Sequence, residues 1–319
     1  MDQPSFGFKA SIGFFLIIFL ITVSLSLKIF KAFFMVNFNG ELVEGNGTIL
    51  NADNRGLQFG DALFERLRVV NGDVFFLEEH YLRLMSSMRI LRMVIPMNFT
   101  MEFMEAEILR LISKINADKG YEIKFTVYRN STKKDAANVN SISYVITAKE
   151  LEHTFFTINT GDYEVELYKD FYKNSTMLSN LETTNKILYT VAEIYANEND
   201  YDDCLLLNER KQVVETLKGN IFLVKDKCIK TPPLTDGCLN GVLRKKLMDI
   251  IAKLEDYQLL EESISPFELQ KADEIFLTNS IDGIVSITKY RKKNFNDVAA
   301  KALIGKLNAA ARLSLTKTV

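Results

Sequence analysis

The segment from Glu215 to Arg244 constrains the fold of this chain most strongly, because it joins a carboxylate, a tight strand pair and a helix-opening glycine. The strand pair is predicted from GNIFLVKD and CIKT, and Gly241 in LNGVLRKK stands where a helical pattern begins. The first N–H groups of a helix have no partner within the helix, so such a start can hold an anion. The segment therefore predicts a strand pair followed by a helix that begins at this glycine, with a carboxylate ahead of them.

The N-terminal half of the chain shows the alternation of a small antiparallel sheet. VNFNGELV and LRVVNGDVFFL alternate apolar and polar residues, and the Asn71-Gly72 pair favours a tight hairpin turn. Apolar residues then recur at helical spacing over 78–91 and 101–115, and YEIKFTVYR and SISYVITAKEL predict two further strands. These elements predict a small N-terminal domain over residues 35–154.

A second set of elements begins near residue 155. Strands are predicted from CLLLN, QVVET, IFLVKD, CIKT and EIFLTN, and helices at 185–197, 242–254, 266–270 and 295–313. Mixed strands with helices packed outside them are typical of an α+β protein. We therefore predict a two-domain α+β fold in which residues 155–319 form the larger, β-rich domain, with the active site between the domains.

The composition excludes several classes of function. The 319 residues carry a net charge of -2 and are 47% hydrophobic, which is typical of a globular enzyme and offers no basic excess for nucleic acid. Cys204, Cys228 and Cys238 form no CxxC pair, and His80 and His153 are the only histidines. The sequence therefore predicts neither a metal site nor a disulfide framework, and the thiols are expected to be reduced, as in the cytoplasm.

The apolar segment SIGFFLIIFLITVSLSL, within residues 1–34, is the exception. It runs for about 17 residues without a charge, near the lower limit for crossing a bilayer, between Lys9 and Lys28. We interpret it as the result of a start codon assigned too far upstream; an uncleaved membrane anchor and a buried core helix are the alternatives. The fold is then expected to begin at Met35, and a membrane location only if residues 1–34 are translated.

The motifs as a set resemble the class IV aminotransferases, which include branched-chain aminotransferases, D-amino acid aminotransferases and aminodeoxychorismate lyases. The resemblance rests on RGLQFGDALFERLRV at 55–69, FLEEHYLRL around Arg83, the ETLKGN segment of Glu215 and the LNGVLRKK turn. It implies a fold-type IV architecture like that of D-amino acid aminotransferase, pyridoxal 5'-phosphate as the cofactor, and a homodimer. The implied substrates are a small amino acid or 2-oxo acid, or aminodeoxychorismate, and the motifs leave transaminase and lyase both open.

The resemblance also implies roles for individual residues around the cofactor. Glu215 would bond the pyridine nitrogen and keep it protonated. The groups expected to bind the cofactor phosphate are the Arg83 guanidinium, the Ser280 hydroxyl and the N–H groups of Gly241, Val242 and Leu243. A solvated arginine, an ordinary helix cap and a surface glutamate are the plain alternatives for these residues. His80 is interpreted as a packed structural histidine.

One position departs from the family pattern. The family has a lysine that forms a Schiff base with the cofactor aldehyde, three residues ahead of an asparagine, and the residue in that place here is Glu182, ahead of Asn185. A carboxylate cannot form that bond, so activity is expected to fall by several orders of magnitude. Lys186, and less readily Lys218, could substitute for it. A degenerate family member, a sequencing error or a deliberate substitution would also account for the glutamate.

Three residues are predicted on the substrate side. Phe59 and Arg68, in the 55–69 motif, are expected at the mouth of the site, and Lys124 falls where the family has a cation for the substrate carboxylate. A solvent-facing lysine on an alternating strand is the plain alternative for Lys124. The leading function is amino-group chemistry with pyridoxal 5'-phosphate. The alternative is a non-catalytic pseudoenzyme that binds the cofactor or a partner through the retained pocket.

Overall fold

The computed structural model describes residues 35–45, 50–130 and 141–315. The apolar N-terminal segment, residues 1–34, lies outside the described residues, and so do the expectations attached to it. Within the described part of the chain, none of the helices combines the length and the apolar character that crossing a membrane requires.

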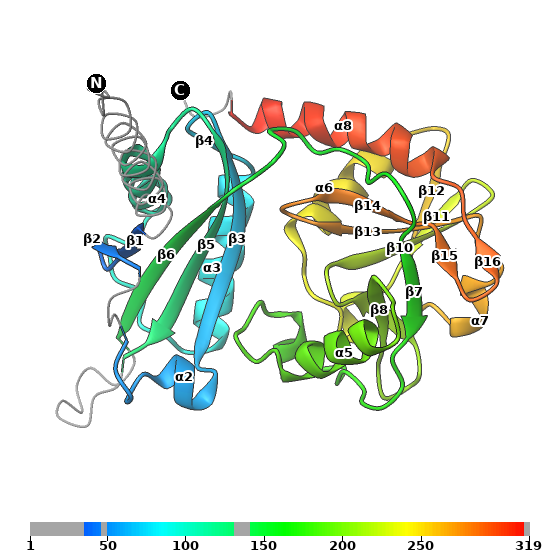
Figure 1. The fold of residues 1–319 in the computed structure, drawn as a ribbon, viewed down its shortest axis with the longest axis horizontal. Helices are drawn as coiled ribbons and strands as arrows, with labels where there is room; N and C mark the ends of the chain where they lie inside the picture. The colour runs from blue at the N-terminus through cyan, green and yellow to red at the C-terminus, as the bar shows by residue number, and fades with distance from the viewer. Residues whose placement is uncertain (1–34, 46–49, 131–140, 316–319) are drawn as a thin grey trace, which may run out of the picture.

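The first half of the chain forms a six-stranded sheet with helices packed on it (Figure 1). Its elements are β1 (Met35–Phe38), β2 (Glu41–Glu44), α2 (Arg55–Phe59), β3 (Ala62–Val70), β4 (Asp73–Val74), α3 (Leu77–Ile90), α4 (Met101–Ile115), β5 (Gly120–Arg129) and β6 (Ile142–Glu150). The strand order is β2-β1-β6-β5-β3-β4, and neighbouring strands are antiparallel.

The long strand β3 divides its side chains between the two faces of this sheet, because successive residues of a strand point to opposite sides. Leu63 and Leu67 are buried in a core that they share with α3 and α4. Phe64 and Arg66 alternate with them and line a cavity that the second half of the chain completes. One face of the sheet is therefore covered by helices, and the other contributes to a site.

The second half of the chain contains two five-stranded sheets, ordered β12-β11-β10-β13-β14 and β16-β15-β7-β8-β9. Its elements are β7 (Glu164–Leu167), η2 (Met177–Asn180), α5 (Ile187–Glu198), β8 (Asp203–Leu207), β9 (Val213–Thr216), β10 (Asn220–Lys225), β11 (Cys228–Thr231), η3 (Leu234–Asp236), α6 (Val242–Ile251), β12 (Gln258–Glu261), α7 (Pro266–Leu269), β13 (Glu274–Asn279), β14 (Gly283–Ile287), β15 (Lys289–Tyr290), β16 (Lys293–Asn294) and α8 (Val298–Leu315).

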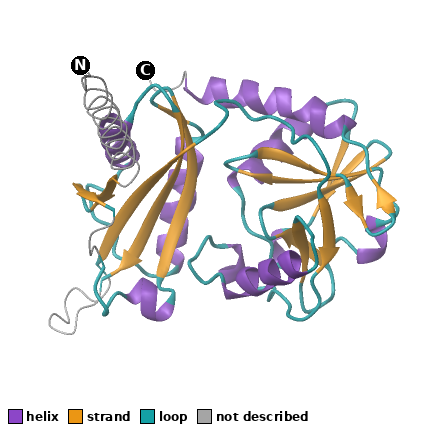
Figure 2. Cartoon of the chain, viewed as in Figure 1, coloured by secondary structure: helices purple, strands orange, loops and turns teal. Residues whose placement is uncertain are grey.

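These helices and strands are arranged in layers (Figure 2). Buried apolar side chains hold the layers together. Leu247 of α6 and Leu303 of α8 pack with Phe276 on one face of the first of these two sheets. Leu205 and Ile221 belong to the core between the two sheets. Helix α5 packs against the second sheet through a further cluster. The burial of apolar surface in these layers stabilises the half of the molecule that carries most of the predicted site.

The predicted α+β fold is confirmed, and most of the predicted elements are present. Helix α4 occupies the predicted range 101–115. The turn between β3 and β4 has a positive φ at both central residues, 53° at Asn71 and 83° at Gly72, which is the geometry that matches the twist of a hairpin. The predicted boundary near residue 155 falls in the connection between β6 and β7, and the division into two domains stays a prediction.

The prediction does not include the strands β7, β12, β14, β15 and β16, and two helices also differ from it. The motif at 55–69 opens with a helix, α2, which is capped by the Asn54 side chain and ended by Gly60 in a left-handed conformation with φ 63°. A helix this short has no apolar periodicity from which it could be predicted. The last helix begins at Val298, where the Glu274 carboxylate accepts the N–H groups of Ala299 and Ala300 in the first turn.

Arg68 joins the two halves of the molecule. It is buried, and its guanidinium donates hydrogen bonds to the carbonyl oxygens of His153 and Ile281. The same guanidinium lies 4.9 Å from the ring centroid of Phe156. Phe76, which precedes α3, is buried in the core of α6 and α8. The face of the first sheet is thereby fixed against the second half of the chain.

Candidate active site

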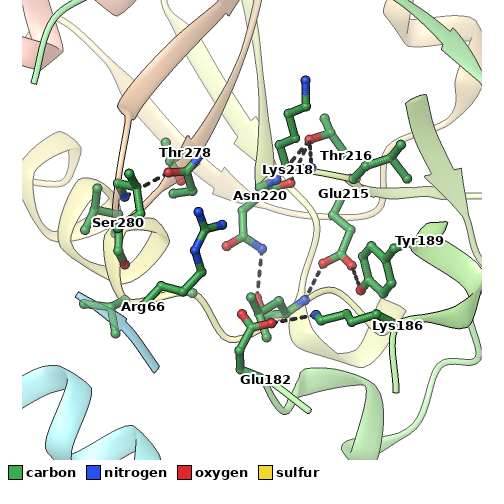
Figure 3. A pocket seen from close by; sticks show the side chains of 18 of the residues that line it. Arg66, Glu182, Lys186, Tyr189, Glu215, Thr216, Lys218, Asn220, Thr278 and Ser280 are labelled. Carbon is green, nitrogen blue, oxygen red and sulfur yellow. Dashed lines mark hydrogen bonds and ion pairs between the residues drawn. The ribbon is translucent and has the colours of Figure 1, made fainter. Parts of the chain in front are cut away.

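A cavity of about 350 Å³ is lined by β3 and α3 from the first half and by β9, the start of α6 and the end of β13 from the second (Figure 3). It draws together most of the residues that the sequence singled out. Those that line it are Arg83, Glu182, Lys186, Glu215, Gly241, Val242, Leu243 and Ser280. Lys218, the weaker substitute, lines it as well.

Arg83 is held on α3 by a buried carboxylate. Its Nε donates to Oε1 of Glu65 at 2.8 Å, and Nδ1 of His80 lies 2.6 Å from the other oxygen of the same carboxylate. Burial alone would lower the pKa of Arg83, but the charge of Glu65, its hydrogen bond and the charge of Glu182 together raise that pKa. Nη1 donates to the carbonyl of Asn240 at 3.2 Å, which brings the guanidinium to the turn ahead of α6.

The start of α6 presents backbone donors to the same cavity. Gly241 is the N-cap residue, and its own N–H is donated to the Leu239 carbonyl at 2.9 Å. The next N–H groups, of Val242 and Leu243, belong to the first turn, where the helix supplies no acceptor. A Cβ on Gly241 would collide with the Asn220 side chain. The position therefore requires glycine, and two of the three predicted backbone donors remain for a ligand.

The end of β13 adds hydroxyl groups to the cavity wall. Thr278 and Ser280 both line the cavity, and Figure 3 shows them together on one side of it. Oγ1 of Thr278 is buried and has no hydrogen-bond partner among the residues that the structure describes. Buried hydroxyl groups in folded proteins are usually bonded. An acceptor or donor supplied by a bound ligand would satisfy this atom.

Glu215, on β9, is 2% exposed and is the centre of a hydrogen-bond network. Oε2 accepts from the N–H of Leu239 at 2.7 Å, while Oε1 accepts from Nζ of Lys173 and from the hydroxyl of Tyr189. Burial, and then the Glu215 charge, raise the pKa of Tyr189 well above its usual value. Tyr189 therefore stays a neutral donor, and the carboxylate is fixed from three sides.

Glu182 and Lys186 form an ion pair in the wall of the cavity. Nζ of Lys186 lies 2.6 Å from Oε1 of Glu182. The backbone of Glu182 is anchored to the first half, because its carbonyl accepts the N–H of Phe64 at 3.0 Å. The position that the family pattern gives to lysine therefore faces the cavity as a carboxylate, with an amine directly against it.

The substrate-side residues separate into two groups. Lys124 stands directly opposite Arg66 across the β3–β5 pair, and its Nζ lies 4.6 Å from the ring centroid of Phe64. Burial, and then the charge of Arg66, lower the pKa of Lys124. Like charges placed opposite each other destabilise a sheet. Since Arg66 and Phe64 line the cavity, the two cations lie at its edge, where the Arg66 guanidinium is paired with the Glu122 carboxylate.

Phe59 and Arg68 lie elsewhere. Phe59 lines a second hollow of about 840 Å³, and 61% of its surface is exposed. Arg68 shares a strand face with Arg66, but its guanidinium donates hydrogen bonds to carbonyl oxygens in the contact between the two halves of the molecule. The structure therefore brings neither residue into the cavity that holds Glu215.

Among the residues of this region that sequence reasoning missed, three hold predicted residues in place. They are Glu65, which holds Arg83, and Lys173 and Tyr189, which hold Glu215. Glu65 could have been found, since it is a charged residue on the strand face that is otherwise apolar. The other two had no local signal. Lys173 and Glu215 are 42 positions apart in the sequence.

The charged groups of this cavity suit an anionic organic molecule. No group of three or more His, Cys, Asp or Glu side chains in the described part of the chain could hold a metal. One end of the cavity offers a guanidinium and helix-start donors, and another offers a buried carboxylate. These features can bind a phosphate at one end of a ligand and a protonated ring nitrogen at the other.

Comparison with known proteins agrees with this chemistry. A sequence model of the family described as "Amino-transferase class IV" matches residues 62–290. A putative branched-chain-amino-acid aminotransferase of Methanocaldococcus jannaschii is 28% identical, over 83% of this chain and 96% of its own length. A D-alanine aminotransferase of Staphylococcus epidermidis is 26% identical, over 82% of this chain and 91% of its own.

Two solved structures share the fold. The branched-chain aminotransferase of Thermoproteus uzoniensis, solved with norvaline, superposes with a TM-score of 0.75 at 24% identity, covering 89% of this chain and 95% of that one. A putative 4-amino-4-deoxychorismate lyase of Legionella pneumophila gives a TM-score of 0.70 at 24% identity, covering 82% and 95%.

Proposed function

Because the chain belongs to the amino-transferase class IV family, we propose that its cavity binds pyridoxal 5'-phosphate, the cofactor of that family, for amino-group chemistry on a small amino acid or 2-oxo acid. One observation carries the proposal. Four separated segments bring Arg83, Glu215, Ser280 and the start of α6 to the walls of one cavity. Each of these groups suits a different part of the same cofactor.

The phosphate end fits the residues present. Arg83 is directed to the turn before α6 by its bond to the Asn240 carbonyl, so a phosphate placed there would meet its guanidinium and the N–H groups of Val242 and Leu243 together. A guanidinium and a helix start both favour a dianion. The unpartnered Oγ1 of Thr278 supports the same placement, because it needs a ligand atom to bond.

The ring end fits as well. Bound pyridoxal 5'-phosphate supplies an aldehyde and a protonated ring that accepts electrons from a substrate carbon. In this chain the Glu215 carboxylate would hold the proton on the ring nitrogen, and Tyr189 and the Leu239 N–H keep that carboxylate oriented. Arg66 and Lys124, at the edge of the cavity, would orient the carboxylate of an amino acid or 2-oxo acid.

The test is a pair of measurements on the full chain. Binding is measured by equilibrium dialysis with pyridoxal 5'-phosphate in phosphate-free buffer, and amino-group transfer by the loss of aldehyde absorbance on addition of single amino acids. We expect binding, followed by loss of absorbance with some L- or D-amino acids. Aminodeoxychorismate, assayed by release of pyruvate, tests the lyase reaction. Absence of cofactor binding would contradict the proposal.

The second candidate function is a pseudoenzyme that binds the cofactor without turning over a substrate. It is favoured by Glu182, a carboxylate in the cavity wall at the place of the family's Schiff-base lysine. The same two measurements separate the candidates: binding with no loss of absorbance for any amino acid supports the pseudoenzyme. A Glu182→Lys variant that gains transfer would show that the rest of the site is competent.

We also propose that the protein is a homodimer. Leu57, Phe59 and Leu178 are each more than half exposed, at 72%, 61% and 59%, and the last two line the second hollow. Exposed apolar side chains that gather around a hollow are typical of a contact surface. Light scattering on the eluted protein should give twice the mass of the chain, and Leu57→Asp should lower it, while Val298→Asp, a change at an exposed site on α8, should not.

For location, we propose the cytoplasm, unless residues 1–34 are translated as an anchor. The support is chemical: Cys204, Cys228 and Cys238 are all free thiols, which suits a reducing compartment. Cell fractionation with sequencing of the mature N-terminus tests this, since recovery of a chain that begins at Met1 in the membrane fraction would contradict it.

A further inference from the structure

We infer that Lys186 is the amine that joins covalently to the cofactor aldehyde in this chain, and that Glu182 serves as its proton acceptor. The inference rests on the proposed function, because it concerns the same cavity and the same cofactor. Both positions then have roles that differ from the family pattern. The Glu182 carboxylate, in place of the family's lysine, transfers protons, and Lys186, four residues later, forms the covalent bond to the aldehyde carbon.

The two side chains meet inside the cavity. Nζ of Lys186 is 2.6 Å from Oε1 of Glu182, and both residues line the cavity that contains Arg83 and Glu215. Figure 3 shows the Lys186 side chain running along the cavity wall toward Glu182, with Glu215 on the neighbouring side. The Lys186 amine therefore lies beside the carboxylate of Glu182, although the backbone of Lys186 is four residues further along the chain.

The backbone of Lys186 allows this reach. Lys186 is the N-cap residue of α5, and its carbonyl accepts the N–H of Thr190 at 2.9 Å. Its side chain crosses two aromatic rings, with Nζ 4.4 Å from the centroid of Tyr189 and 5.4 Å from that of Phe64. The rings guide the methylene chain and stabilise the ammonium by cation–π attraction. The backbone of Lys186 is therefore fixed, while its side chain remains 34% exposed and can shift toward a ligand.

The other lysines of the region are directed to other partners. Nζ of Lys173 is bonded to Glu215, at the ring-nitrogen end, and the aldehyde of pyridoxal 5'-phosphate lies across the ring from that nitrogen. Only 7% of the Lys173 side chain is exposed. Nζ of Lys218 donates to the Asp202 carbonyl at 2.7 Å, and Figure 3 shows its side chain pointing away from Glu182. Of the two lysines among the described residues that line the cavity, Lys186 is therefore the one whose amine lies against Glu182.

The chemistry balances with these two residues and the aldehyde alone. The Glu182 carboxylate first takes a proton from the Lys186 ammonium, and the neutral Nζ attacks the aldehyde carbon, so that an N–C bond forms and the C=O electron pair moves onto oxygen. Glu182 gives that proton to the oxygen, takes a second proton from Nζ and gives it to the same oxygen, which departs as one molecule of water. The product is a C=N bond between Lys186 and the aldehyde carbon, and Glu182 ends as it began.

Borohydride trapping with peptide mass mapping tests the inference on the full chain. The protein is incubated with pyridoxal 5'-phosphate, reduced and digested, and non-covalent binding is measured in parallel by equilibrium dialysis. We expect the adduct on Lys186. It should be lost in Lys186→Arg, which keeps the charge opposite Glu182, and retained in Lys253→Met, a change at an exposed lysine after α6. Dialysis should show that Lys186→Arg still binds the cofactor.

The Glu182→Gln variant separates nucleophile from proton acceptor. Its adduct should form on the same lysine but about 10²- to 10⁴-fold more slowly, the usual value of a general base. An adduct on Lys173 or Lys218 in the unmodified chain would overturn the inference, and so would cofactor binding with no adduct on any lysine. Absence of cofactor binding would instead refute the proposed function, and the inference with it.

Discussion

The Glu65 carboxylate and the Arg83 guanidinium form a buried pair across the β3–α3 contact, with Nε 2.8 Å from Oε1. Glu65 lies on the strand face whose other members, such as Leu63 and Leu67, are packed against helices. The arginine proposed to bind the cofactor phosphate is thus positioned from the core of the first half. Stability and ligand binding are coupled through this one carboxylate.

Replacing Glu65 with Gln should lower the free energy of unfolding by about 3–5 kcal/mol, because it leaves the Arg83 charge buried without its partner. Urea unfolding of the cofactor-free protein measures this. Glu122→Gln is the matched control: it breaks the pair between Arg66 and Glu122, in which the arginine is 46% exposed, and should cost less than about 1 kcal/mol. Equal losses in the two variants would contradict the buried-pair interpretation.

Acid should destabilise the protein partly through His80. Burial lowers the pKa of this histidine from its usual 6.5, so the folded state resists a proton that the unfolded chain accepts. Stability is therefore complete above about pH 6.5 and is lost as the pH falls from there toward the folded pKa. Urea midpoints at several pH values should fall over this window in the natural chain and fall less in His80→Asn. A histidine with a raised pKa would give the opposite slope.

Arg83→Lys should weaken pyridoxal 5'-phosphate binding by about one to two powers of ten, since hydrogen bonds to charged groups contribute about 1.5–3 kcal/mol. A lysine cannot contact Glu65 and a phosphate with a rigid fork of donors. Fluorescence titration gives the dissociation constant. Arg89→Lys changes an exposed residue on the same helix and should leave the constant unchanged, so an equal effect there would point to the helix and not to the guanidinium.

Gly241→Ala should damage the cofactor site, because the added Cβ would collide with the Asn220 side chain at the start of α6. We expect weaker cofactor binding and a lower melting temperature. Gly305→Ala is the control on α8, where a Cβ meets nothing within 4 Å, and it should raise stability by about 0.5–1 kcal/mol through helix propensity. Unaltered binding in Gly241→Ala would place the phosphate elsewhere.

The parts of the site that could be predicted are those encoded by local sequence. The helix that carries Arg83 follows from helical spacing in FLEEHYLRL, and the α6 start follows from a glycine ahead of an apolar pattern. The roles predicted for Arg83 and Glu215 rest on the resemblance of their segments to the class IV family. Each of these segments carries its own backbone geometry, and the fold then needs only to bring the segments together.

The parts that could not be predicted depend on contacts between distant segments. Arg68 lies two residues after Arg66 on β3 and looks equivalent to it in the sequence, yet the chain after β6 crosses its end of the strand and takes its donors. Lys173 reaches Glu215 from a loop without periodicity. Such partners are decided by how loops pass over a sheet, which the pattern of apolar residues does not record.

The cluster formed by Val70, Phe75, Phe76 and Phe156 with α6 and α8 has a consequence for dissection of the chain. Aromatic side chains from the first half complete the core of the second half. A cut near residue 155 would therefore expose apolar surface on each fragment, and that surface would promote aggregation. The fragments are therefore poor candidates for separate production. The intact chain is expected to unfold on heating in a single cooperative transition.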